Sequence, residues 1–152
     1  MTEAQVRKEV RAAALEAETA TPEQAFNTLA TLVEERLYVD RGAELLPLLD
    51  RLDALAANPF QRVGALLLRS DYSMHRKERL DEGLKAAEHA VELATHAGFE
   101  WFRVGGALNV AILHTMQSRH ARAAQMAEVL WSEARRWPDP KQRCNLLGKI
   151  GF

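Results

Sequence analysis

Residues 81–94 read DEGLKAAEHAVELA, and their small and apolar residues recur at three- and four-residue spacing. This spacing predicts an amphipathic helix with one apolar face. A weaker copy follows forty residues later, where Glu128 and Ala134 take the places of Glu88 and Ala94. A repeat of this length predicts stacked helical hairpins, each of which buries its apolar face only against its neighbours.

The composition agrees with a folded, helical chain. Hydrophobic residues make up 47% of the 152 residues, which argues against disorder. No run reaches the roughly 18 consecutive apolar residues that a membrane span needs. The charged start, Met1 to Glu9, lacks the apolar core of a secretory signal. We therefore expect a cytoplasmic protein that does not bind membranes.

Local signals divide the chain into helices. Thr21 to Gln24 has the pattern of a capping box with Pro22 at the first helical position, Gly98 suits a helix C-terminus, and residues 138–140 break the chain. We expect an all-α fold of about seven to eight helices in a single domain, residues 1–152. Its expected parts are a leading helix in residues 1–20, antiparallel hairpins at 22–57, 60–97 and 99–137, and the first helix of an incomplete further repeat at 138–152.

Over residues 22–152, strongly at 79–94 and loosely elsewhere, the chain resembles the tetratricopeptide repeat superfamily. The family pattern has small residues at set places in the second helix of each hairpin, and Gly83, Ala87 and Ala90 match them, while Leu80 stands where an aromatic is usual. The longer period is similar to degenerate repeats found ahead of output domains in bacterial signalling proteins, such as GGDEF diguanylate cyclases and LuxR-type regulators. The resemblance implies a right-handed superhelix of hairpins, a TPR-like α-solenoid. No GGDEF sequence or DNA-binding helix-turn-helix is recognisable.

The resemblance also implies that first helices line a concave, partner-binding face. Asn109 matches a family position whose amide hydrogen-bonds a bound peptide backbone, and Arg69 and Arg76 suit a carboxylate or phosphate. The alternative is that these helices present only a solvated face. The candidate residues are Leu68, Arg69, Tyr72, His75, Arg76, Leu108, Asn109, Ile112, Thr115 and Met116.

Two further sets of apolar residues have open interpretations. The third hairpin concentrates aromatic residues that serve either core packing or a partner contact: Trp101, Phe102, Trp131 and Trp137. The chain ends like a repeat without its second helix, which indicates either a fragment of a longer protein or a face that pairs with a second copy. The candidate self-association residues are Leu146, Leu147, Ile150 and Phe152.

Patterns typical of enzymes are missing from the sequence. His89 and His96 are two helical turns apart, too far for one zinc ion, and we expect no metal and no cofactor. The single cysteine, Cys144, is expected in a helical core or groove, and Gly64, Gly105 and Gly106 at close helix contacts.

The charge balance also bears on partners. Residues 1–59 have a net charge of −5 and residues 60–152 of +4, but no block of arginines follows one helix face, so we expect no nucleic-acid binding. The predicted function is a non-catalytic module that binds a protein or peptide, in the N-terminal regulatory or sensory region of a bacterial signalling protein such as a diguanylate cyclase. The alternatives are a module that forms a homodimer through its C-terminal helix, a region of a LuxR-type regulator, and a small-ligand sensor.

Overall fold

The computed structural model describes residues 8, 12, 20–37 and 45–150, and within them every regular element is an α-helix. The all-α prediction is therefore confirmed. Along the chain the helices are α2 (Pro22–Leu37), α3 (Leu45–Leu55), α4 (Pro59–Arg76), α5 (Leu80–Ala97), α6 (Glu100–Met116), α7 (His120–Arg135) and α8 (Pro140–Ile150). Residues 1–20, expected as a leading helix, lie largely outside the described residues, as does Phe152.

Local signals set several helix ends, and those at Thr21–Gln24 and Gly98 are as the sequence predicts. Thr21 and Gln24 form the capping box, since each backbone N–H donates to the side-chain oxygen of the other residue at 3.2–3.3 Å. Asn58 caps α4 by accepting from the backbone N–H of Gln61 at 2.9 Å. Gly98 ends α5 with a φ of 74°, which a residue without a Cβ adopts at little cost.

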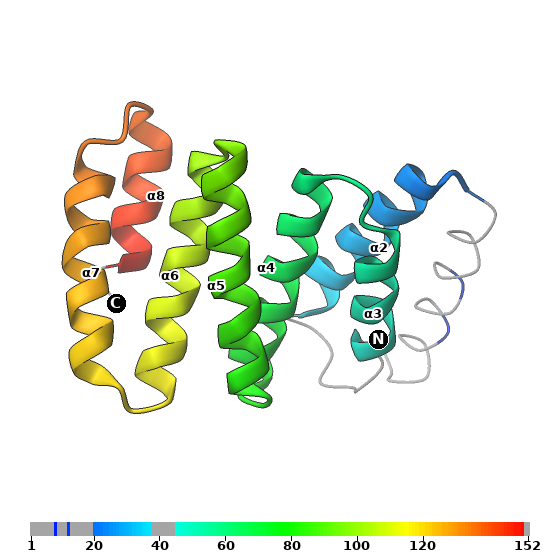
Figure 1. The fold of residues 1–152 in the computed structure, drawn as a ribbon, viewed down its shortest axis with the longest axis horizontal. Helices are drawn as coiled ribbons and strands as arrows, with labels where there is room; N and C mark the ends of the chain where they lie inside the picture. The colour runs from blue at the N-terminus through cyan, green and yellow to red at the C-terminus, as the bar shows by residue number, and fades with distance from the viewer. Residues whose placement is uncertain (1–7, 9–11, 13–19, 38–44, 151–152) are drawn as a thin grey trace.

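Each helix packs against the next one along the chain, and α8 lies between α7 and α6 in the view of Figure 1. The connections at 77–79, 98–99 and 117–119 are short, so neighbouring helices run antiparallel. In addition, α2 contacts α4, and α4 contacts α6, so alternate helices also meet. Among the described helices, none is long and apolar enough to cross a membrane.

The core is divided along the row of helices. One cluster joins α2, α3 and the side of α4 that carries Tyr72, while another joins α6 and α7 to Leu146 of α8. Between them, α5 presents fully buried alanines, Ala87, Ala90 and Ala94. Because an alanine side chain is short, α4 and α6 approach α5 closely on both sides.

Candidate functional site

A groove of about 460 Å³ is lined by residues of α4, α6 and α8, with none contributed by α5 or α7. We call it the inner groove. Most of its lining is apolar: Leu67, Met74, Trp101, Leu108, Ile112, Met116 and Leu146. The polar lining residues are Asp71, His75, Asn109 and Lys149.

Helical periodicity explains why these residues share one groove. On α4, the lining residues Leu67, Asp71, Met74 and His75 are three to four positions apart, and α6 repeats the pattern from Gly105 to Met116. Residues at this spacing lie on one face of a helix. Since α4 and α6 contact each other, their two faces form adjoining walls.

The polar centre of the groove is a hydrogen-bonded set that joins α4 to α6. The amide nitrogen of Asn109 donates to the hydroxyl oxygen of Ser70 at 2.7 Å and to Oδ1 of Asp71 at 2.8 Å. The Ser70 hydroxyl in turn donates to the backbone carbonyl of Leu67 at 2.8 Å. Ser70 is fully buried and Asp71 is half-buried, so this set belongs to the floor of the groove.

Burial acts on the pKa of Asp71. Removal of the carboxylate from water raises the pKa of Asp71 above its ordinary value. The hydrogen bond from Asn109 and the positive charges of His75 and Lys149 act in the opposite direction on that pKa, and burial outweighs them. The charged form of Asp71 is therefore less favourable in the groove than in water.

A second groove of about 400 Å³ adjoins the first, between α6, α7 and α8. The two share Leu108, Ile112, Met116 and Lys149, so they meet over one face of α6. Thr115 and His120 line only the second groove. Together the two grooves give a mainly apolar surface around α6.

The inner groove contains five of the ten first-helix candidates predicted from the sequence. They are His75, Leu108, Asn109, Ile112 and Met116, and Thr115 lines the adjoining groove. The role expected for Asn109 needs correction, however. Both of its amide hydrogens are used by Ser70 and Asp71, so its side chain is left with only its oxygen for a ligand.

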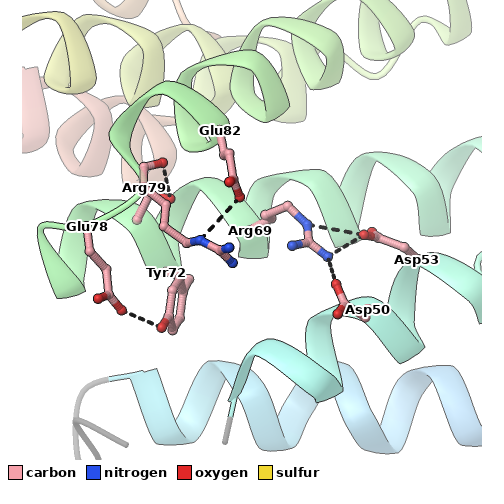
Figure 2. A network of polar contacts seen from close by, with 8 residues as sticks. Asp50, Asp53, Arg69, Tyr72, Glu78, Arg79 and Glu82 are labelled. Atoms are coloured by element: carbon pink, nitrogen blue, oxygen red, sulfur yellow. Dashed lines mark hydrogen bonds and ion pairs between the residues drawn. The ribbon is translucent and has the colours of Figure 1, made fainter. Parts of the chain in front are cut away.

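Arg69 has an internal role, which corrects its assignment to a ligand. Its guanidinium binds Asp50 at 2.8 Å and Asp53 at 2.5 Å, both on α3 (Figure 2). Burial alone would lower the pKa of Arg69, but the two ion pairs together outweigh burial and raise that pKa. Arg69 thus fastens α4 to α3, and its charge is already matched.

The prediction that Tyr72 lines the groove is wrong, because Tyr72 belongs to the core. Only 1% of its surface is exposed, and it packs in the cluster of α2 and α3, to which Leu68 also contributes. Its hydroxyl hydrogen-bonds a carboxylate oxygen of Glu78 at 2.5 Å (Figure 2). Burial and this carboxylate together raise the pKa of Tyr72 to about 12.

Arg76 lies in a different hollow, at the end of α4, with His75, Lys77 and Glu78. Its Nε and one terminal nitrogen are buried and make no hydrogen bond to the residues that the structure describes. Arg76 therefore does not face the inner groove, contrary to the expectation from the sequence.

The three residues predicted for self-association that the structure describes pack within the chain. Leu146 is buried against α6 and α7, and Leu147 and Ile150 are partly buried in the same cluster. Contacts with Val104 and Leu130 cover the face that the sequence left without a partner. The prediction that Leu146 is exposed for pairing is wrong, because α8 docks on its own chain.

The aromatic residues divide between packing and exposure. Trp101 and Trp137 meet edge to face with ring centres 5.7 Å apart, and Phe102 packs in the same manner on Phe60. Trp131 keeps 40% of its surface exposed. The prediction of a core or groove position for Cys144 is wrong, because Cys144 is exposed.

Only one of the three predicted close-contact glycines has such a contact. A Cβ on Gly106 would lie 2.9 Å from a methyl group of Val91. At Gly64 and Gly105 a Cβ would meet nothing within 4 Å. Gly105 instead lines the inner groove.

Sequence reasoning missed two polar residues of the groove, Asp71 and Lys149, whereas Trp101 was already a candidate for either core packing or a partner contact. A signal for Asp71 was present, since it lies four residues after Leu67 and four before His75. Within the described part of the chain, no group of three His, Cys, Asp or Glu side chains is placed to hold a metal ion.

Comparisons with protein-family models, with curated proteins and with solved structures give no match for this chain. The function proposed below therefore rests on the geometry and chemistry of the grooves.

Proposed function

We propose that this chain is a non-catalytic, TPR-like binding module that takes a protein or peptide segment in the inner groove. The observation that carries the proposal is the composition of the groove wall: alternate helices α4, α6 and α8 supply all of it, around a small polar centre. Apolar walls with few, placed polar groups are typical of sites that bind by shape and a small number of hydrogen bonds. Such an arrangement also suits hairpins stacked in a short superhelix.

The hydrogen bonds at the groove floor support a binding role over catalysis. A hydrolytic centre needs a nucleophile whose proton is taken by a neighbouring base. The Ser70 hydroxyl donates instead to the backbone of Leu67 and accepts from Asn109, and it makes no hydrogen bond to Asp71. The polar groups of the floor thus hold one another in place and join two helices.

As in tetratricopeptide repeat proteins, we propose that such binding regulates an attached or partner domain, for example in a bacterial signalling protein. Self-association through α8 is the weaker candidate, since Leu146 is already covered by its own chain. The groove volume also lies within the range that small-molecule sites occupy, roughly 300–1,000 Å³. A test must therefore compare peptides with small ligands.

The test is an array of heptapeptides, acetylated and amidated, with random apolar and small residues around a variable centre. Binding is measured by fluorescence anisotropy for the native chain and for two matched variants. Ile112→Asn removes a 37%-exposed apolar side chain from both grooves, and Val129→Asn removes a 60%-exposed one that lines neither of them.

We expect Ile112→Asn to weaken peptide binding about tenfold, equivalent to about 1.4 kcal/mol, and Val129→Asn to leave it unchanged. Because both substitutions are neutral, the result does not depend on the charge of the peptide. If no peptide binds, or if Val129→Asn has the larger effect, the groove is not the peptide site.

A further inference from the structure

The polar floor of the inner groove offers hydrogen-bond acceptors and few donors. The orientation of the Asn109 amide follows from its partners. Asp71 as a carboxylate only accepts, and the Ser70 hydroxyl hydrogen is committed to the carbonyl of Leu67. Only the amide nitrogen satisfies both contacts, so the Asn109 oxygen and the second oxygen of Asp71 remain for a ligand.

Asp71 also has no matching cation within the part of the chain that the structure describes. Among the described residues, no lysine, arginine or histidine lies within the 4 Å of an ion pair with Asp71. His75 and Lys149 act on it from a greater distance, and both are exposed. A half-buried carboxylate with one hydrogen bond from Asn109 is therefore poorly compensated for its loss of water.

Resting on the proposed peptide-binding function, we propose that the inner groove selects a peptide segment with a lysine among apolar residues, the lysine ammonium being held by Asp71 and the Asn109 oxygen. The four-carbon lysine stem packs along apolar wall while its charged head reaches a polar centre. Trp101, eight residues before Asn109 on α6, adds further apolar wall to the same groove.

Lysine fits this floor better than arginine. An ammonium has three donors on one compact atom, whereas a guanidinium spreads five donors over a rigid plane. The floor presents a single carboxylate and one amide oxygen. A guanidinium would therefore bury several N–H groups without acceptors.

Lys149 allows a test in which two substitutions should change peptide binding in opposite directions. It lines the groove and carries a positive charge near Asp71, so it repels a bound lysine. Its removal should strengthen binding of a cationic peptide, and the removal of the Asp71 charge should weaken it. A ligand with a carboxylate at the same place would respond with both signs reversed.

The experiment uses the heptapeptide array with lysine, Nε-acetyl-lysine, arginine or glutamate at the centre, and hexylammonium as a small-molecule probe. We expect lysine peptides to bind best, and acetylation of the lysine to weaken binding at least tenfold. Asp71→Asn should weaken lysine-peptide binding about tenfold, while Lys149→Ala strengthens it about threefold at low salt. Circular dichroism melts establish that both variants are folded.

Equal binding of lysine and acetyl-lysine peptides, or a preference for glutamate, would overturn the lysine proposal and leave peptide binding intact. Hexylammonium bound as tightly as the best peptide would overturn the choice of a peptide as occupant. The absence of binding to every peptide, with native and variant chains alike, would reject both the lysine proposal and the peptide-binding function.

Discussion

Gly83 of α5 lies so close to Ser73 of α4 that a Cβ added at Gly83 would be 2.4 Å from the Cβ of Ser73. Real Cβ atoms do not approach one another to that distance. The two helices can therefore pack this closely only because Gly83 has no side chain. Ser73 is itself buried, and its hydroxyl donates to the backbone carbonyl of Arg79 at 3.2 Å. The absence of a side chain at position 83 thus has a packing reason.

Gly83→Ala should destabilise the fold by about 1–3 kcal/mol, because α4 and α5 must separate to admit the methyl group. The measurement is the free energy of unfolding in urea. Gly64→Ala is the matched control within α4, since its Cβ would meet nothing within 4 Å. That variant should gain about 0.5–1 kcal/mol from the lower entropy of the unfolded chain. Similar stabilities for the two variants would contradict the close approach.

Leu146→Ala should loosen α8 and cost about 2 kcal/mol, since Leu146 is 3% exposed against α6 and α7. We expect a lower melting temperature and no change in molar mass by light scattering. The exposed neighbour Asn145→Ala should leave both unchanged. If Leu146→Ala changes the molar mass but not the melting temperature, the result would support the dimer interface that the sequence suggested.

His114 should make stability depend on pH. Burial lowers the pKa of His114, and Arg119 and Arg122 lower it further, while Glu88 acts in the opposite direction. The folded chain therefore favours neutral His114. Its contribution to stability is complete above the unfolded pKa of about 6.5 and is lost as the pH falls from there to the folded pKa.

The measurement for His114 is the melting temperature from about pH 7.5 to about pH 5. Native protein should lose stability on acidification, and His114→Gln should flatten the curve in this window. The exposed His89→Gln is the control and should keep the native slope. Identical slopes for native protein and His114→Gln would refute the prediction.

Asp71→Asn should stabilise the free protein at neutral pH. Because burial raises the pKa of Asp71, the folded state binds its proton more tightly than the unfolded state does. The contribution of Asp71 to folding stability is favourable below the unfolded pKa and disappears as the pH rises through the folded pKa. At about pH 7.5 the charged carboxylate therefore destabilises the folded state. The amide oxygen of the new side chain still accepts from Asn109.

Thermal melts at about pH 7.5 and about pH 3.5 check this, with the larger gain expected at the higher pH. Asp50→Asn is the contrasting variant, since it breaks the ion pair with Arg69 and should cost up to about 1 kcal/mol at pH 7.5. A loss of stability in Asp71→Asn at neutral pH would show that its charge is compensated inside the fold.

Asp71 and Tyr72 show how far the sequence alone predicts which side chains face the groove. One residue step turns a helix by about 100°, so Asp71 and Tyr72 point to different sides of α4. The sequence reading chose Tyr72, whereas the fold buries Tyr72 against α2 and α3 and leaves Asp71 in the groove. The choice depends on the rotation of α4, which its contacts with α2, α3 and α6 set together.

The sequence by itself determined the helices and their ends, because periodicity and caps such as Thr21, Asn58 and Gly98 act over only a few residues. Only the tertiary structure decided which charges are already matched. Arg69 meets Asp50 and Asp53 across 16 to 19 residues, and Asn109 meets Asp71 across 38. Such pairs depend on how whole helices are rotated and spaced by packing, which local spacing does not encode.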